Sequence, residues 1–352
     1  MSQLAPAPSP LFPPLAVAVC ITCLAGASAL SYCALLTALI KQTKRGLFLI
    51  ILQLAIADFL LLATSVWPEL LSCNDRTWNF GKYGCSAHRG FSVFASTASM
   101  YLSATAALHM LATNNVQEKK TKRRLKVYQR NEDAEDLRSS CNSLVANSDS
   151  SNPRTVNVDY RLTEDRVPVK LPLIFVWILS ASLSIPDFTL STIVNIDHNI
   201  EQCTLVDSQH QLNLYWIFSI GNLSLSTLIL ISLAVLLLYK IITSKKNISK
   251  DVSAGLKLSL RLIIVHTVLC VPRLVFNIYG AFYNNYFFNQ ISLSNVTKQQ
   301  DNVLIMISLA LGIAYQMATV IRPLICILTM PSLRKVFNVI GKKKLRSNND
   351  CV

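Results

Sequence analysis

Seven long runs of apolar residues, separated by polar segments, dominate the hydrophobic pattern of the chain. A helix needs about 20 predominantly apolar residues to cross a bilayer, and runs of this length are typical of spanning helices. The pattern therefore predicts a bundle of seven transmembrane helices. The runs are Leu15–Ile40, Leu47–Leu71, Gly90–Thr113, Leu171–Ile196, Leu212–Tyr239, Leu262–Phe288 and Asn302–Met330.

The composition supports an all-α membrane protein. Hydrophobic residues make up 52% of the 352 positions and charged residues only 15%, whereas a soluble domain carries roughly 25% charged residues. Residues 1–14 contain no Lys or Arg and so lack the basic segment that begins a cleavable signal peptide. We therefore expect the first apolar run to be a spanning helix itself.

Basic residues are concentrated on one side of the predicted membrane. The segments after runs one, three, five and seven are rich in Lys and Arg, including KKTKRRLK at 119–126 and KKK at 342–344. The alternate segments hold only Arg76, Lys82, Arg89 and Lys298. The positive-inside rule then places the N-terminus outside and the C-terminus in the cytoplasm. The net charge of +14 reflects this topology and not nucleic-acid binding, and we expect a multi-pass protein of the plasma membrane.

These signals divide the chain into an extracellular N-terminus (1–14), a seven-helix domain (15–340) and a cytoplasmic tail (341–352). The domain is interrupted at 114–170 by a segment that begins basic, turns acidic (NEDAED) and continues polar. Its low hydrophobicity and mixed charge predict disorder, with the basic start held at the lipid surface. Residues 331–340 read PSLRKVFNVI, in which apolar residues at i, i+3, i+4 and i+7 predict a short amphipathic helix lying on the membrane.

Several motifs, in order and correctly spaced, resemble the rhodopsin-like G-protein-coupled receptors. These are LAIAD (54–58), WNFG (78–81), Cys85, Trp177, Cys203, Pro272 and Pro323. The resemblance implies a receptor that binds an extracellular ligand and couples to a heterotrimeric G protein. It also implies a disulfide between Cys85 and Cys203, although Cys73 could compete for either partner.

The motifs that drive activation in this family are degenerate here. Where the third helix of the family carries Asp/Glu-Arg-Tyr, this chain has His109-Met110-Leu111. Cys270 stands where the sixth helix has a Trp, and Arg322 and Cys326 replace the Asn and Tyr of Asn-Pro-x-x-Tyr in the seventh. These losses favour an alternative in which the protein is a non-signalling decoy or regulatory relative. A transporter or channel is a further alternative, since charged residues inside a membrane often mark transport pathways.

Asp58 lies in the middle of the second apolar run, where a carboxylate costs about 2.5–3.5 kcal/mol on insertion scales. In the resembled family this Asp binds a sodium ion together with a Ser that matches Ser99 and the Asn that is replaced here by Arg322. Arg stays protonated in proteins, and Asp58 is the one acid at that depth. We therefore expect an Asp58–Arg322 ion pair that takes the place of sodium; the alternative is that Arg322 contacts backbone carbonyls or extends toward the interface.

The ligand pocket is expected in the outer half of the bundle. Arg273 follows Pro272 at that level and could either pair with Glu69 or bind a carboxylate of the ligand, while Asn277 and Tyr279 could line the same wall. Ser92 and Gln316 occupy the positions at which amine receptors carry an Asp and opsins a Lys. Amine binding and light detection are therefore disfavoured, which leaves a peptide as the favoured ligand.

Two further expectations concern the outer loops and the chemistry. The second extracellular loop carries acidic residues and no basic ones, which would attract a basic peptide; the acids are Asp187, Asp197, Glu201 and Asp207. Asn295 begins the extracellular glycosylation sequon Asn-Val-Thr. No nucleophile–base set or metal-ligand spacing is visible in the sequence, so we expect neither an enzyme nor a cofactor.

Overall fold

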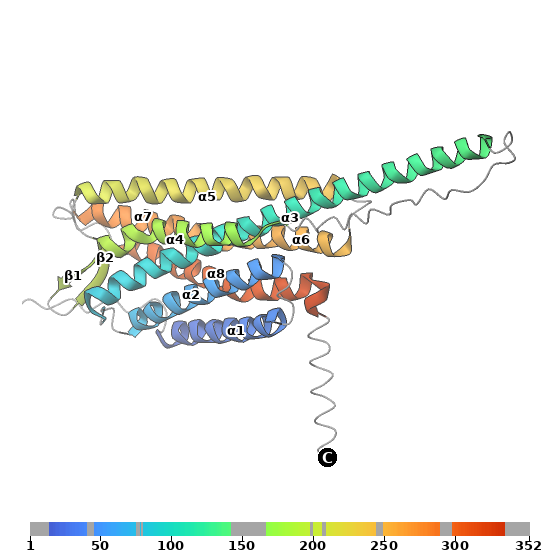
Figure 1. The fold of residues 1–352 in the computed structure, drawn as a ribbon. Coiled ribbons are helices and arrows are strands. Elements are labelled where there is room, and N and C mark those ends of the chain that lie inside the picture. Colours follow the sequence, from blue (N-terminus) through green and yellow to red (C-terminus); the bar gives the residue numbers. More distant parts are fainter. Residues whose placement is uncertain are drawn as a thin grey trace, which may run out of the picture.

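The computed structural model describes residues 14–40, 46–74, 78, 80–141, 167–197, 200–205, 209–243, 249–288 and 298–334. Within these ranges the chain is an elongated helical bundle with one two-stranded hairpin at one end (Figure 1). The elements are α1 (Pro14–Ile40), α2 (Gly46–Asn74), α3 (Gly81–Cys141), α4 (Lys170–Leu190), β1 (Ser191–Asp197), β2 (Ile200–Leu205), α5 (Gln209–Thr243), α6 (Lys250–Val265), the π-helical turn η1 (His266–Cys270), α7 (Val271–Phe288) and α8 (Lys298–Thr329).

Seven helical segments in the described part of the chain are long and apolar enough to cross a membrane. They correspond to the seven predicted runs, with α6, η1 and α7 together forming the sixth span. Large apolar side chains remain exposed on the outside of the bundle, among them Leu30, Leu171 and Ile217, which are 73–77% exposed. Apolar surface of this extent is unfavourable in water but matches the hydrocarbon of a bilayer.

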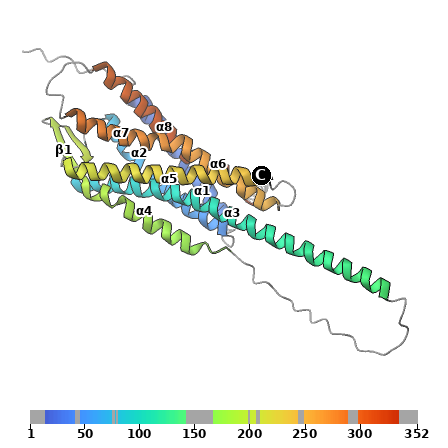
Figure 2. The same ribbon diagram turned by 90° about the horizontal axis from the view of Figure 1, so that it is seen from above.

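α3 is the central helix of the bundle. It packs against α2, α4, α5 and α6, and Figure 2 shows α4 and α8 on opposite sides of it. The main apolar core includes Leu102 and Ala106 from the first half of α3 together with Phe48, Ile51 and Leu256 from neighbouring helices. This packing fixes the depth and direction of the polar side chains that α3 presents to its neighbours.

Two expectations about secondary structure were wrong. The fourth run was expected to be helical to Ile196, but α4 ends at Leu190 and β1 begins at Ser191, because β-branched residues such as Thr192, Ile193 and Val194 favour extended backbone. The start of the 114–170 segment was expected to be disordered, but α3 continues to Cys141. Its charged residues are good helix formers, and neither Gly nor Pro occurs between Gly90 and Pro153.

The sixth span changes its helical geometry next to Pro272. Proline lacks an N–H and cannot donate the hydrogen bond that an α-helix requires at that position. The chain widens into η1 just before it, and the Val271 N–H donates to the His266 carbonyl, five residues earlier. Such π-turns occur frequently at functional sites, and this one directs His266 and Cys270 toward the interior of the bundle, where both are buried.

The remaining expectations concern the ends of the spans. Helical backbone resumes at 331–334 after α8, and Leu333 is fully buried there, but 335–340 lie outside the described residues. So do 1–13, the tail 341–352, most of the 142–170 segment and the sequon at Asn295. The predicted orientation of the bundle in the membrane stays a prediction.

Candidate functional site

A β-hairpin covers one end of the bundle and is tied covalently to α3. The structure contains the disulfide Cys85–Cys203, with the two Cα atoms 5.5 Å apart. Cys85 is fully buried, and Cys203 pairs with Ile193 in the antiparallel register of the hairpin. The Ser86 hydroxyl also donates to the Ser191 carbonyl at 3.3 Å. β1 and β2 are therefore held against the first turns of α3; the side chain of Cys73 lies outside the described part of the structure.

Beneath this hairpin lies a cavity of about 400 Å³, here called the outer cavity. It is bounded by α3, α4, β2, α5 and α7, and this volume lies within the roughly 300–1,000 Å³ of small-molecule sites. Hydroxyl and amide groups line much of it: Ser92, Ser96, Thr97, Ser219, Asn222 and Asn277. Apolar contact comes from residues such as Met100 and Phe218. The lining can thus form several hydrogen bonds while enclosing an apolar group.

Arg89, Asp187 and Tyr215 contribute a polar group at the wall of the outer cavity. The Tyr215 hydroxyl donates to Asp187 Oδ1 at 2.9 Å, and Arg89 Nη2 lies 3.6 Å from the same oxygen. The Asp187 side chain is only 5% exposed, whereas that of Arg89 is 28% exposed. Asp187 therefore belongs to α4 and to this buried group, and its assignment to an acidic extracellular lid was wrong. The side chains of Asp197, Glu201 and Asp207 lie outside the described part of the structure.

The predicted pocket residues separate into two groups. Ser92 and Asn277 line the outer cavity. Arg273 does not line it: its Nη1 donates to the carbonyl and the hydroxyl of Ser308 on α8, at 2.6 and 2.9 Å. The expected partner of Arg273, Glu69, lies in α2 with its side chain outside the described part. Gln316 is buried deeper in the bundle, next to the polar cluster described below.

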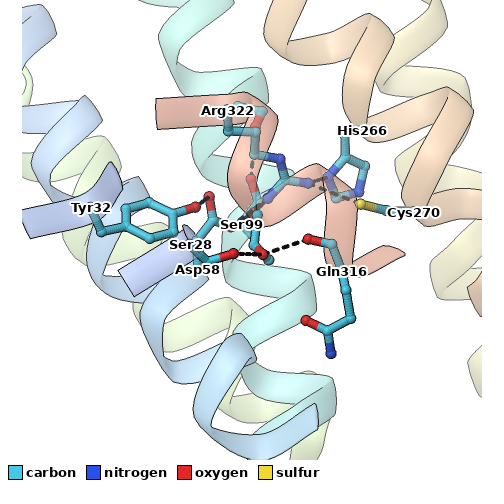
Figure 3. Close-up of polar contacts among 10 residues, drawn as sticks. Ser28, Tyr32, Asp58, Ser99, His266, Cys270, Gln316 and Arg322 are labelled. Atoms are coloured by element: carbon cyan, nitrogen blue, oxygen red, sulfur yellow. Dashed lines mark hydrogen bonds and ion pairs between the residues drawn. The ribbon is translucent and has the colours of Figure 1, made fainter. Parts of the chain in front are cut away.

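That deeper cluster centres on Asp58 of α2, Ser99 of α3 and Arg322 of α8, which point toward one another in Figure 3. Arg322 Nη1 forms an ion pair with Asp58 Oδ1 and donates to Ser99 Oγ at 2.6 Å. Ser99 in turn donates to Asp58 Oδ1 at 2.6 Å. The three residues are at most 2% exposed. The guanidinium thus lies directly against the carboxylate, and the contact expected from the sequence is present in the structure.

The structure adds partners that the sequence analysis did not include. The Tyr32 hydroxyl of α1 donates to Asp58 Oδ2 at 2.8 Å. On the other side, Arg322 Nη2 lies 2.7 Å from His266 Nδ1 and 3.1 Å from Cys270 Sγ. A guanidinium can only donate, so His266 Nδ1 must accept and its ring is neutral, with the proton on Nε2. The periodicity of single helices carries no signal for these contacts, because the partners come from α1, η1 and α8.

This arrangement supplies the electrostatic balance that a buried carboxylate requires. The positive charge of Arg322 offsets the negative charge of Asp58, and Ser99 and Tyr32 satisfy carboxylate oxygens that would otherwise lose hydrogen bonds with water. A cation entering beside Asp58 would meet the guanidinium charge. Among the described residues no group of His, Cys, Asp or Glu is arranged to bind a metal ion.

About halfway along α3, the degenerate motif forms an apolar contact. Met110 is buried and packs against Gly255 of α6, where an added Cβ atom would lie 2.4 Å from Met110 Cε. His109 lies beside Gly46, and Leu111 packs against the main core. Two turns beyond, Lys240 Nζ of α5 lies 3.0 and 3.1 Å from the two carboxylate oxygens of Glu118. The contacts of this part of α3 with α5 and α6 thus combine an ion pair with apolar packing.

Comparison with models of protein families gives no match for this chain, and comparison with curated proteins gives none either.

Proposed function

We propose that this membrane protein is a receptor of the rhodopsin-like G-protein-coupled type, which senses an extracellular ligand at the plasma membrane and couples to a heterotrimeric G protein. The observation that carries the proposal is the outer cavity, which lies beneath a hairpin tied by Cys85–Cys203 to the helix that runs through the whole bundle. A ligand in this cavity would contact five elements at once. It could therefore change the relative positions of α3, α5 and α7.

A peptide is the favoured ligand class. The cavity volume suits the terminal residues of a peptide, and its serine, threonine and asparagine groups can pair with peptide N–H and C=O groups. Binding of this kind can shift a two-state equilibrium only if the ligand contacts differ between the states. The cavity supports this, because it is lined by α3 and also by α7, whose preceding turn η1 contacts Arg322 through His266 and Cys270.

The proposal is tested by G-protein activation in cells that express the protein at the surface, scanned across G-protein subtypes with a peptide library. Ser96→Leu places an apolar side chain in the outer cavity, and Ser182→Leu, on the exposed face of α4, is the matched control. We expect a saturable response that Ser96→Leu weakens and Ser182→Leu retains. A surface-expressed protein that neither binds nor responds to any peptide would contradict the proposal.

A non-signalling decoy or regulatory role is the second candidate. It is favoured by the buried Met110 at the position where the family has an Arg that reaches toward the G protein. Under this alternative, a labelled peptide binds to cells that express the native protein and binds more weakly to cells that express the Ser96→Leu variant. No G-protein subtype responds in either case. Binding and activation must therefore be measured on the same cells.

A further inference from the structure

A cleft lies between α6 and α8 at the basic end of the bundle, the end from which α3 projects in Figure 1. It has a volume of about 500 Å³ and shares no lining residue with the outer cavity or with the Asp58–Arg322 cluster. Its lining includes four cationic side chains, Lys250, Lys257, Arg261 and Arg334, and two hydroxyl groups, on Ser253 and Thr329. None of the eight described residues that line this α6–α8 cleft is acidic.

The cations occupy one face of α6 because of their spacing. Lys250, Lys257 and Arg261 stand at i, i+7 and i+11, which the helical period places on a common stripe. At a rise of 1.5 Å per residue, the stripe extends over about 16 Å along the helix. The N-terminus of α6, capped by Ser249, lies at the same end and adds the positive pole of the helix dipole.

Two of the cleft cations donate to uncharged groups, and the one acid in the first turn of α6, Asp251, does not line the cleft. Arg261 Nη1 donates to the Thr329 hydroxyl at 2.8 Å, and Arg334 Nη2 donates to the Leu328 carbonyl at 2.5 Å. Both acceptors are neutral. The contrast is with Lys240 at the same end of the bundle, whose charge is balanced by Glu118. The cleft thus concentrates positive charge where two helices could contact one anion together.

We infer that the α6–α8 cleft binds the phosphorylated inositol headgroup of a lipid in the cytoplasmic leaflet. Several phosphate groups on one ring match several cations that line one cleft, and guanidinium groups bind phosphate oxygens in pairs. The Lys and Arg distribution predicts that this end lies at the cytoplasmic surface, where anionic lipids are enriched. Leu328 also lines the cleft and is 60% exposed, which provides an apolar contact for acyl chains. A lipid source is therefore favoured over a soluble phosphate.

The test uses full-length protein in phosphatidylcholine nanodiscs that contain either a bisphosphorylated phosphatidylinositol or phosphatidylserine at equal total charge. Binding is measured with a fluorescent bisphosphorylated phosphatidylinositol. The double variant Lys257→Gln/Arg261→Gln removes two cleft cations, and Lys119→Gln/Lys122→Gln removes two exposed cations from α3, outside the cleft. Arg261→Lys retains the charge and checks whether loss of the Thr329 contact alone matters. Thermal unfolding without anionic lipid confirms that each variant is folded.

We expect the cleft variant to lower the affinity for the inositol lipid by roughly 10- to 30-fold. Each Lys or Arg near an anionic surface raises the affinity by roughly three- to fivefold, and this variant removes two. The α3 variant should change it by less than about threefold, and Arg261→Lys, which keeps the charge but loses the paired guanidinium contact, should give an intermediate loss. Equal losses in the cleft and α3 variants, or equal binding of phosphatidylserine, would overturn the proposal. Stronger binding of the lipid than of its soluble headgroup supports the lipid source; equal binding would overturn that source while retaining a phosphate site.

Discussion

Arg322 of α8 and Asp58 of α2 form a buried ion pair in the middle of the bundle, with Ser99 of α3 bonded to both. Three helices that are far apart in the sequence are thereby joined at one point. Because both charges are almost completely buried, neither can be compensated by water if its partner is removed. The pair is the part of the structure whose disruption should have the largest effect on stability.

Loss of either charge should destabilise the fold. Arg322→Asp leaves two acids together, and we expect a loss on the order of 3–5 kcal/mol in unfolding free energy together with poor surface expression. Adding Asp58→Arg restores opposite charges and should recover much of the expression. Thermal unfolding and surface labelling provide the measurement, with the exposed substitution Lys119→Asp as a control. Equal expression of the single and swapped variants would rule out the ion pair.

Sodium should not stabilise the native protein. The Arg322 guanidinium occupies the side of Asp58 on which a cation would otherwise be attracted, so exchanging sodium for choline should leave the unfolding temperature unchanged. Arg322→Asn removes the positive charge and leaves Asp58 beside Ser99. This variant should gain a sodium-dependent rise in unfolding temperature, since a ligand that binds only the folded state stabilises it. A sodium response in the native protein would contradict the replacement hypothesis.

His266 should contribute to stability as a hydrogen-bond acceptor. His266→Leu keeps the site filled but leaves Arg322 Nη2 without this acceptor, and we expect a loss of about 1–3 kcal/mol. His266→Asn retains a side-chain oxygen and should lose less. The comparison is made by chemical or thermal unfolding in a fixed detergent. If the Leu variant were as stable as the native protein, the contact with Arg322 would carry no net stabilisation.

The contact between Met110 and Gly255 should control the spacing of α3 and α6. Gly255→Val places a branched side chain where even a Cβ atom lies within 2.4 Å of Met110 Cε, and overpacking typically costs about 1–3 kcal/mol. Met110→Ala removes the side chain that the new valine would strike. The double variant Met110→Ala/Gly255→Val should therefore be more stable than Gly255→Val alone. A double-mutant cycle of unfolding temperatures tests this coupling, and additive effects would show that the two residues act independently.

The positions of the spanning helices follow from local sequence, because a bilayer requires long apolar segments and the chain contains seven. The boundaries were less predictable. Ser191–Asp197 is apolar enough to extend the fourth run, yet it forms a strand because it pairs with Ile200–Leu205. The mixed charge that begins at residue 114 predicted disorder. The same charged residues have high helix propensity, however, and α3 continues to Cys141.

The candidate sites, too, were predictable from the sequence only in part. The family resemblance put Arg322 at the depth of Asp58, and the cost of burying either charge singly favoured their pairing over the alternative contacts of Arg322. The roles of Tyr32, His266 and Cys270 at that pair could not be predicted, and neither could the pairing of Asp187 with Tyr215. These contacts depend on helix rotation and on the π-turn before Pro272.

Sequence by itself thus determined the number of spans and the charge asymmetry, and it favoured the Asp58–Arg322 pair, because hydrophobicity and the cost of burying charge act through residue type. Only the tertiary structure decided that Arg273 contacts Ser308, that Met110 meets Gly255, and that Lys257 and Arg261 share a cleft with Arg334. The physical reason is that such contacts depend on how helices rotate and pack against one another, which is set by the fit of many side chains together.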